Sequence, residues 1–363
     1  MSGGASPRVA LVSIGIGRVQ RGFERYFRDL YGVLRPAAPM VLYKSAGPES
    51  DDERVPRGLW KATHAIRKAG RLAGRAEYHR DCLAYGLCLL PELRRERYDV
   101  VHCIDPPLAT VLSRLRRTIG FPGRVLFTEG TQAPPRLYPR VDHIHHVGAW
   151  ALDNAVALGI PRDHMTLVPC GLDFARFAPP AGREALRERY GVGASTFVVL
   201  AVTAVKRDHK RVDHLIDEVA SLEGDVLLWL DGNPEDDAVL EHGKRVLGPR
   251  LRVTHVASSE VPELYGLADV LVHASLEESF GLAIVEAISS GLPVRVHDNP
   301  HFRWLTGDPD CMVAMDRPGA LAASLRALRG MPRPGPARAA AIRERFDWSV
   351  VAPAYLEMYR RLA

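Results

Sequence analysis

Apolar residues occur along the chain in short continuous runs that alternate with longer segments of helical spacing. The runs are bounded by glycine, proline or polar residues, a pattern that predicts buried strands. They include residues 8–13, 98–103, 124–128, 197–202, 225–230 and 270–272. Between them, stretches such as 22–34, 212–222 and 280–289 carry apolar residues three or four positions apart, which predicts amphipathic helices. This alternation predicts an α/β protein built on parallel, doubly wound sheets.

One strand, turn, helix, strand pattern is especially clear, in residues 271–293, LVHASLEESFGLAIVEAISSGLP. In such a βαβ unit the ligand site lies at the carboxyl end of the first strand, where Glu278 is found, and Glu286 follows within the helix. On one continuous helix the two carboxylates would point about 80° apart, whereas a turn at Glu278 allows both to face one site. The N–H groups of Phe280, Gly281 and Leu282 would then lie at a helix N-terminus, which suits a phosphate.

Composition is that of a globular protein with two domains of ordinary size. The chain has 363 residues, 47% hydrophobic and 25% charged. No apolar run reaches the roughly 20 residues of a membrane span, and residues 1–8 lack the apolar stretch of a signal peptide. Five scattered cysteines without C-x-x-C spacing predict free thiols in a reducing cytoplasm. The net charge of +5 favours acidic ligands and is too small to predict nucleic-acid binding.

A glycine-rich turn follows the first strand, at Gly15, Gly17 and Gly22. The turn after the first strand is a usual place for a substrate-binding loop in such domains. The spacing does not fit the dinucleotide-binding fingerprint, because the third glycine comes too late. We therefore interpret the turn as a substrate loop without assigning a dinucleotide.

A basic amphipathic segment spans residues 54–80, where arginines and lysines surround apolar residues at helical spacing. Such a segment could dock on an anionic membrane or bind an acidic acceptor. A solvated, arginine-rich helix face is the third interpretation, since arginine is used heavily throughout the chain.

Three motifs of the sequence point to a known family. Glu278-Ser279-Phe280-Gly281-Leu282 continues into Glu286-Ala287 and Gly291-x-Pro293-Val294. Residues 164–179 read HMTLVPCGLDFARFAP, and Lys210 follows the strand at 197–202. Together they resemble the E-x7-E region, the end of the first domain and the phosphate-binding lysine of retaining glycosyltransferases of family four, which have the GT-B fold. The glycine and arginine that precede the family's lysine are replaced here by Ala204 and Val205.

The resemblance implies a GT-B fold, in which two Rossmann-like parallel-sheet domains face each other across a cleft. We predict an N-terminal, acceptor-side domain over residues 1–178 and a C-terminal, nucleotide-sugar-binding domain over residues 179–342. Residues 343–363 are expected to form a helix that crosses back onto the first domain. The implied activity is retaining transfer of a sugar from a nucleotide-diphosphate sugar to an acceptor hydroxyl.

The family's residue roles imply a catalytic set here. Lys210 and Arg207, with the amides around Gly281, are expected to stabilise the leaving diphosphate. Glu278 is expected to hold the sugar hydroxyls and Glu286 the ribose. The other implied donor-binding positions are Lys206, Val256, Ser279, Phe280, Gly281 and Leu282, and the turn of Gly15, Gly17 and Gly22 would face the acceptor. No metal ion is required if the cations suffice, and no cofactor is expected beside the donor.

Glu129 stands at a strand end where the family often has a histidine near the anomeric centre. It could orient the sugar, act as a base or be only a turn residue. His143, His145 and His146 lie near the next strand and are expected to be structural, because they lack carboxylate or cysteine partners for a metal.

Two other functions remain open at the level of sequence: a nucleotide-sugar epimerase on the same fold, and a nucleotide-sugar-binding protein that has lost catalysis. UDP is the first expectation for the donor nucleotide. The acceptor could be a cell-surface glycan, a lipid carrier or a small natural product. We expect the protein in the cytoplasm, either free or at the inner face of the membrane through residues 54–80.

Overall fold

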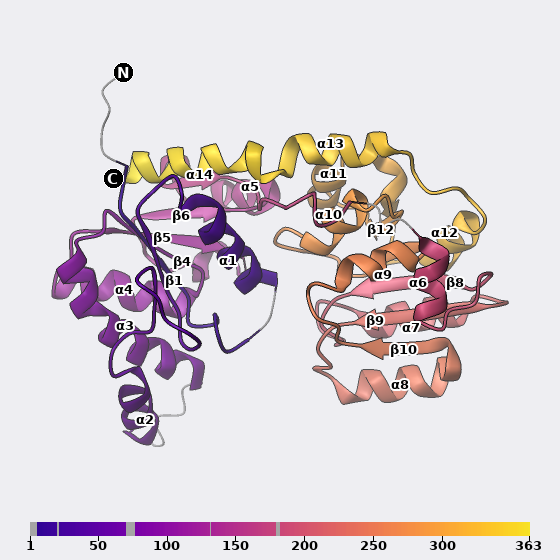
Figure 1. Ribbon diagram of the computed structural model, residues 1–363, viewed down its shortest axis with the longest axis horizontal. Coiled ribbons are helices and arrows are strands. Elements are labelled where there is room, and N and C mark those ends of the chain that lie inside the picture. The colour runs from indigo at the N-terminus through magenta and orange to yellow at the C-terminus, as the bar shows by residue number, and fades with distance from the viewer. Residues whose placement is uncertain (1–5, 20–21, 70–76, 131, 179–181) are drawn as a thin grey trace. The chain divides into compact units, whose positions relative to one another are not determined.

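The computed structural model describes residues 6–19, 22–69, 77–130, 132–178 and 182–363. The chain forms two compact units, one made of Met1–Gly171 and Trp348–Ala363 and the other of Leu172–Asp347 (Figure 1). Each unit contains its own parallel sheet, so the predicted α/β class is confirmed for both.

The chain crosses between the units at residues 171/172 and 347/348, whereas the sequence placed these boundaries at 178/179 and 342/343. The physical reason is a set of contacts within the second unit. The Leu172 N–H donates to the Phe346 carbonyl at 2.8 Å, and Leu172 forms an isolated bridge with Asp347. Both crossing points are therefore tied to the second unit, and the helix that belongs to the first unit begins only at Trp348.

The first unit contains a seven-stranded parallel sheet of order β3-β2-β1-β4-β5-β6-β7. Its strands are β1 (Val9–Val12), β2 (Met40–Tyr43), β3 (Glu53–Arg54), β4 (Val100–Cys103), β5 (Arg124–Glu129), β6 (His143–His146) and β7 (Met165–Leu167). The central strands are buried along their whole length, which explains why they appear in the sequence as continuous apolar runs.

The helices of the first unit bury apolar stripes against this sheet. They are α1 (Gly22–Leu34), α2 (Leu59–Ala69), α3 (Glu77–Glu96), α4 (Pro106–Thr118), α5 (Ala149–Ala157) and α14 (Trp348–Leu362), with short 3₁₀ turns η2 (Pro135–Leu137) and η3 (Arg162–His164). In α1 the buried positions Tyr26, Phe27 and Leu30 recur at helical spacing, as the sequence predicted.

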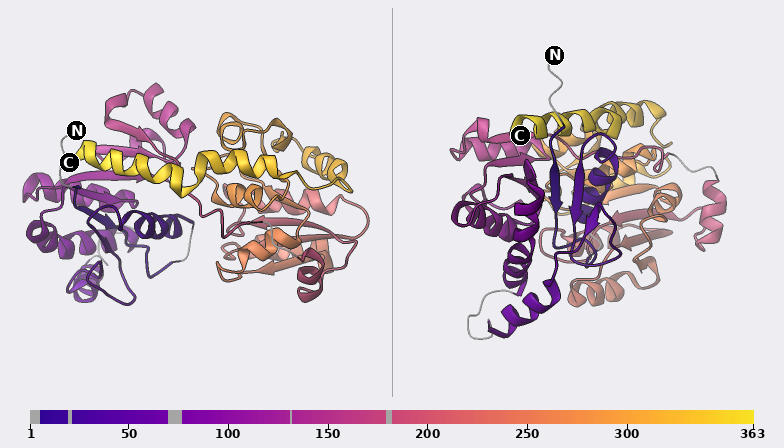
Figure 2. Two further views of the ribbon diagram at one scale, coloured as in Figure 1. Left: turned by 45° about the horizontal axis from the view of Figure 1, so that its top comes forward. Right: turned by 60° about the vertical axis from the view of Figure 1, so that its left-hand side comes forward.

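Helix α14 packs on the first unit beside α1, as Figure 2 also shows. The Tyr355 hydroxyl lies 2.7 Å from that of Tyr26, and the Tyr359 hydroxyl lies 2.8 Å from Nδ1 of His102. All four side chains are buried, so these hydrogen bonds fix the helix on the sheet without leaving polar groups unsatisfied. The predicted return of the chain's last helix to the first domain matches this packing.

Buried histidines continue this polar network through the sheet. Thr128 on β5 links Nε2 of His102 at 2.5 Å to Nδ1 of His145 at 2.8 Å, and Nε2 of His145 lies 2.8 Å from the Val168 carbonyl oxygen. His143 pairs with Thr166 at 2.7 Å. Burial lowers the pKa of His145 to about 3. These hydrogen bonds give His143 and His145 structural roles.

The second unit contains a six-stranded parallel sheet of order β10-β9-β8-β11-β12-β13. Its strands are β8 (Phe197–Val202), β9 (Val226–Asp231), β10 (Leu251–Thr254), β11 (Val270–His273), β12 (Val294–His297) and β13 (Met312–Val313). Its helices are α6 (Arg183–Arg189), α7 (Val212–Ala220), α8 (Asp237–Leu247), α9 (Val261–Leu267), α10 (Leu282–Ser289), α11 (Pro300–Thr306), α12 (Ala320–Leu328) and α13 (Pro336–Phe346), with 3₁₀ turns η4 (Gly248–Arg250) and η5 (Pro309–Cys311).

Neighbouring strands β8 and β11 lie at the centre of this sheet. Parallel strands end at the same edge, so the loops that follow β8 and β11 meet at its carboxyl edge. The first loop carries Lys210 and the second carries Glu278. In the part of the chain that the structure describes, no helix is long and apolar enough to cross a membrane.

Candidate active site

Lys210 and Glu278 meet at the carboxyl edge of the second sheet. Nζ of Lys210 lies 2.7 Å from Oε2 of Glu278. Nε2 of His273, the last residue of β11, lies 2.8 Å from the same oxygen. The side chain of Glu278 is only 14% exposed, so three polar groups meet in a largely dehydrated site.

The hydrogen bonds from His273 and Lys210 keep the carboxyl group of Glu278 ionised. Burial raises the pKa of its carboxyl, but the hydrogen bond and charge of His273 and then those of Lys210 outweigh burial and hold the pKa well below its ordinary range. Both of these hydrogen bonds go to Oε2. A carboxylate oxygen accepts more than one bond, so Oε1 is available to orient a ligand hydroxyl.

His273 is a site residue that sequence reasoning missed. It directly follows the apolar run at 270–272, and nothing in the local pattern marks it as a ligand-binding residue. Its ring packs edge-on against Phe302 at 6.0 Å between centroids, which fixes the imidazole against the core. The sequence feature that could have identified His273 is its position, because the last residue of a parallel strand lies at the ligand-binding edge of the sheet.

The start of α10 follows the loop of Glu278. Gly281 precedes the helix with φ 99°, a left-handed conformation that favours glycine. The first N–H groups of a helix lack intrahelical partners and carry partial positive charge, so Leu282 stands where amides can meet a phosphate. Phe280, by contrast, packs between Trp304 and Phe346, and its carbonyl accepts from Nε2 of His301 at 3.0 Å. Its side chain thus supports the turn from the core.

Glu286 and Ser279, which the sequence predicted to bind the sugar donor, are also buried. Oε2 of Glu286 accepts a hydrogen bond of 2.7 Å from the Tyr265 hydroxyl on α9. The tyrosine fixes the orientation of this carboxylate on α10, a second contact that the sequence did not reveal.

The basic loop after β8 divides into residues with different partners. Lys206 pairs with Glu235 at 3.1 Å, and Arg207, whose side chain is 61% exposed, pairs with Asp213 at 3.0 Å. Only Lys210 of the three predicted cations contacts Glu278. The structure therefore brings Lys210 to the predicted site and places the charges of Lys206 and Arg207 in separate ion pairs.

Arg211 and Val205 explain how this loop is held. Arg211 has φ 50°, and its guanidinium donates to the Met315 carbonyl at 2.9 Å. Val205, at the position of the family's arginine, is fully buried and its N–H donates to the Asn233 carbonyl at 2.8 Å. An apolar anchor thus occupies the position where the family pattern has a cation.

Val256 is expected to face the nucleobase through its backbone. Its N–H already donates to Oδ1 of Asp231 at 3.0 Å, the carboxylate that ends β9. The contact to a base would therefore use the carbonyl of Val256 or a neighbouring group.

The residues that the sequence predicted to face the acceptor lie in the first unit. The Gly15 N–H donates to Oγ of Ser13 at 3.2 Å, and a Cβ at Gly15 would overlap the carboxylate of Glu24. Gly17 has φ 88°, and a Cβ there would lie 2.2 Å from the Ala46 carbonyl oxygen. Gly17 is thus required by its backbone conformation and by the Ala46 backbone, whereas a side chain at Gly15 would displace that of Glu24. Gly22 is the first residue of α1.

Asp105 supports this turn from the end of β4. Its Oδ2 accepts from the Ile14 N–H at 3.1 Å and its Oδ1 from the Tyr78 hydroxyl at 2.6 Å. Burial raises the pKa of this carboxyl. Glu129, the last residue of β5, is buried one strand away, at the same edge of the sheet as the glycine turn.

Comparison with known proteins agrees with this picture. Residues 196–330 match the family model described as Glycosyl transferases group 1. A GDP-mannose-dependent alpha-mannosyltransferase of Mycobacterium tuberculosis is 32% identical over 171 residues, which is 47% of this chain and 41% of that protein. A D-inositol 3-phosphate glycosyltransferase of Kineococcus radiotolerans is 31% identical over 231 residues, 54% and 52% of the two chains. The chain spans about half the length of the curated relatives it matches.

Solved structures share the fold over nearly the whole chain. The sucrose-phosphate synthase of Thermosynechococcus elongatus superposes with a TM-score of 0.77 at 18% identity, covering 98% of this chain and 99% of that one. Anabaena Alr3699/HepE in complex with UDP-glucose superposes with a TM-score of 0.76 at 16% identity, covering 98% and 100%. The predicted GT-B fold and the resemblance to group 1 glycosyltransferases are confirmed.

Proposed function

We propose that this chain, whose residues 196–330 belong to the glycosyl transferases group 1 family, transfers a sugar from a nucleotide-diphosphate sugar to an acceptor hydroxyl. We further propose retention at the anomeric carbon and no requirement for a metal. The observation that carries the proposal is the contact of Lys210 and Glu278, with His273, beside the N-terminus of α10.

Each group suits one part of the transfer. The ammonium of Lys210 has three protons, of which one reaches Glu278, so the others are available to the leaving diphosphate. The amide of Leu282 can add to this stabilisation as negative charge develops. Oε1 of Glu278 would accept from sugar hydroxyls, and Glu286 from the ribose.

The bonds balance without a side-chain base. The bond between the anomeric carbon and the diphosphate oxygen breaks, and a bond from the acceptor oxygen to the same carbon forms. The acceptor's proton passes to an oxygen of the leaving diphosphate. In this scheme Glu129 orients the sugar or assists from the first unit.

The donor is proposed to be a UDP sugar, with a GDP sugar as the alternative. One relative is named a GDP-mannose-dependent mannosyltransferase, and one structural neighbour was solved with UDP-glucose. The Val256 N–H is already bonded to Asp231, so a nucleobase would be bound through the Val256 carbonyl. A backbone contact of this kind is compatible with the base of either UDP or GDP.

The acceptor is proposed to be a glycan, a lipid-linked sugar or a small molecule. Another relative is named an alpha-galactosylglucosyldiacylglycerol synthase. On α2, Trp60 is 80% exposed, near the exposed Lys61 and Lys68. We propose that this helix, the described core of the basic 54–80 segment, contacts the inner face of the membrane from the cytoplasm; residues 70–76 lie outside the described part.

The test begins with a thermal-shift screen of UDP, GDP and ADP, because only the nucleotide that binds will stabilise the protein by mass action. The matching nucleotide sugar is then incubated with the protein, and the release of nucleotide diphosphate and free sugar is measured. Glu278→Ala and Lys210→Ala should abolish release, whereas Lys244→Ala on the exposed surface of α8 should not.

Two results would contradict the proposal. Conversion of the donor to an isomeric nucleotide sugar would indicate an epimerase. Tight binding of the donor without turnover on any acceptor would indicate a binding protein.

A further inference from the structure

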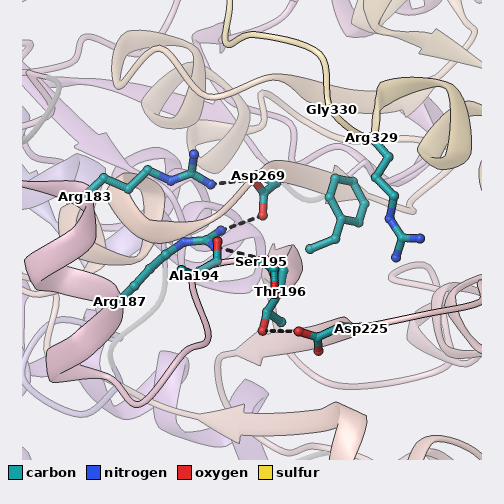
Figure 3. Close-up of a pocket in the computed structure, with 10 residues that line it drawn as sticks. Arg183, Arg187, Ala194, Ser195, Thr196, Asp225, Asp269, Arg329 and Gly330 are labelled. Atoms are coloured by element: carbon teal, nitrogen blue, oxygen red, sulfur yellow. Dashed lines mark hydrogen bonds and ion pairs between the residues drawn. The ribbon is translucent and has the colours of Figure 1, made fainter.

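A second polar pocket lies in the same unit, at the opposite edge of the sheet. It is lined by residues that precede β8, β9 and β11, by α6 and by the residues that follow α12, and its volume is about 340 Å³ (Figure 3). Asp225 precedes β9 and Asp269 precedes β11, so the pocket lies at the amino ends of strands whose carboxyl ends carry the candidate active site.

Two arginine side chains of α6 form one wall of this pocket. Arg183 and Arg187 lie one turn apart on α6, and both pair with Asp269, Arg187 at 2.7 Å. Asp269 also accepts from the Val198 N–H at 2.8 Å. Its single negative charge is thus shared between two guanidinium groups.

The guanidinium of Arg187 is held in place by several hydrogen bonds. Its side chain is buried, and it donates to the carbonyls of Leu267, Ala194 and Thr196 at 3.0, 2.9 and 3.1 Å. Its role is to hold the loop before β8 and to add a permanent charge to the wall.

Arg183 differs from Arg187, because one of its N–H groups has no acceptor among the described residues. Nη2 pairs with Asp269, while Nε is buried and has no hydrogen-bond partner among the described residues. A buried N–H donor without an acceptor is unfavourable, and a bound anion would accept its hydrogen bond. Figure 3 shows the guanidinium of Arg183 beside Asp269 at the upper side of the pocket.

A third arginine lies on the other side. Arg329 extends from the end of α12, stacks over the Phe197 ring at 5.4 Å and donates to the Glu223 carbonyl at 2.8 Å through Nη1. Asp225 on this side accepts from the Thr196 hydroxyl at 2.7 Å. The lining therefore holds three arginines against two aspartates.

The surroundings add to the positive charge. Arg333 lies near the pocket with its guanidinium on the carbonyls of Gly266 and Ala268. Burial, followed by the charges of Arg183 and Arg187, lowers the pKa of Arg333 to about 10. Asp269 acts in the opposite direction, so three neighbouring arginines face one carboxylate here, and an added anion would be stabilised.

We propose that this pocket binds the phosphate group of a small phosphorylated molecule, separately from the donor site. Arginine guanidinium groups match phosphate geometry through paired N–H donors. The volume is at the lower end of ligand pockets, which run from about 300 to 1,000 Å³. It therefore accommodates a phosphate with a small organic group as well as the free ion.

The experiment uses the full chain and inorganic phosphate, glucose 6-phosphate and AMP as probes, with sodium chloride at matched ionic strength as the blank. The double variant Lys210→Met with Glu278→Gln is used as the background, because the candidate active site is also expected to bind phosphate and this variant leaves no buried carboxylate without its cation. In that background we expect at least one probe to raise Tm by about 2–5 °C at a concentration 100-fold above its Kd.

Variants locate the site. Arg183→Gln should weaken binding of that probe by about 10-fold or more, since a charged hydrogen bond is lost. Arg329→Gln, which removes a charge without touching Asp269, gives a second test should Arg183→Gln fail to fold. Arg245→Gln on exposed α8 is the matched control and should leave the affinity unchanged.

The response of the three probes identifies the source of the phosphate. Equal affinity for all indicates the free ion, and tighter binding of one ester indicates contacts to its organic part. Absence of any shift in the protein that carries Lys210→Met and Glu278→Gln, or equal weakening by Arg245→Gln, would overturn the proposal. Neither result bears on sugar transfer, which is measured separately.

Discussion

Nζ of Lys210 lies 2.7 Å from Oε2 of Glu278, although the two residues are 68 positions apart in the chain. They come from loops that follow adjacent parallel strands, so the sheet itself creates the contact. The pair is largely buried, and its desolvation makes each partner depend on the other.

Removing only the cation should therefore destabilise the second unit. Lys210→Met leaves the buried carboxylate of Glu278 with His273 alone, and we expect a loss of about 3–5 kcal/mol in the free energy of unfolding. Urea denaturation at pH 7 measures the change. The double variant Lys210→Met with Glu278→Gln should recover much of the loss, and a strictly additive result would contradict the coupling.

His273 should control the ionisation of Glu278. Burial raises the pKa of Glu278, and the hydrogen bond from His273 is the strongest effect that lowers it. His273→Phe removes that bond, so the pKa should rise toward its ordinary value. The lowered pKa of Glu278 stabilises the folded protein at pH values above the ordinary glutamate pKa of about 4.3. This stabilisation is lost as the pH falls through the lower pKa that Glu278 has in the folded state.

Carbon-13 NMR of the Glu278 carboxyl follows this titration without a substrate. With a donor, the acidic limb of the rate profile should move to higher pH in His273→Phe, and the rate at neutral pH should fall by about 10–100-fold. His273→Gln, whose amide can still donate, should lie between the two. An unchanged carboxyl titration in His273→Phe would show that His273 only fills space.

Gly281 should tolerate no side chain. Its φ of 99° is unfavourable for other residues, and a Cβ would lie 2.9 Å from Cδ1 of Ile284. We expect Gly281→Ala to cost about 1–3 kcal/mol and to weaken binding of the nucleotide diphosphate. Gly32→Ala is the control, because nothing lies within 4 Å of its Cβ in the interior of α1; it should stabilise by about 0.5–1 kcal/mol.

Much of this site could be predicted from the sequence, because it depends on local patterns. The alternation of apolar runs and helical spacing predicts parallel strands whose following loops lie at one sheet edge, and the resemblance to the family's motifs assigned site roles to Glu278 and Lys210 on two of these loops. The pairing of Arg207 with Asp213 could not be predicted, since nothing in a run of basic residues shows which side chain turns inward.

Two other features depended on tertiary packing. His273 looks like a strand residue until the strand's end is placed at the ligand edge. Val205 departs from the family pattern for a reason visible only in three dimensions, because its side chain is buried in the core of the second unit.

Trp60 should carry membrane binding if α2 docks on lipid. The indole is 80% exposed and stacks on His64 with 6.0 Å between ring centroids. Trp60→Ala should reduce binding to phosphatidylserine-containing vesicles by about 10-fold, since burying a large apolar side chain contributes about 1.5–3 kcal/mol. Leu137→Ala, 64% exposed in the same unit, is the control. Vesicle binding that Trp60→Ala leaves intact would show that α2 is a solvated face.

The buried histidines of the first unit should make it sensitive to acid. Burial lowers the pKa of His145 to about 3 and that of His143 to about 4, and it holds the pKa of His102 well below its ordinary range. The folded state therefore binds fewer protons than the unfolded state between pH 6.5 and about 4. Stability is complete above the ordinary pKa of about 6.5 and falls as pH drops below it, by up to about 1.4 kcal/mol per pH unit for each histidine.

Hydrogen exchange of amides in β4, β5, β6 and α14, corrected for intrinsic rates, measures this loss between pH 7.5 and 5. His145→Gln should reduce the slope by about one proton. Tyr359→Phe removes the 2.8 Å hydrogen bond to His102 but no proton-binding group near neutral pH. It should lower protection by about 1 kcal/mol at every pH and leave the slope unchanged. Protection that stays constant down to pH 5 would show that these histidines bind protons equally in both states.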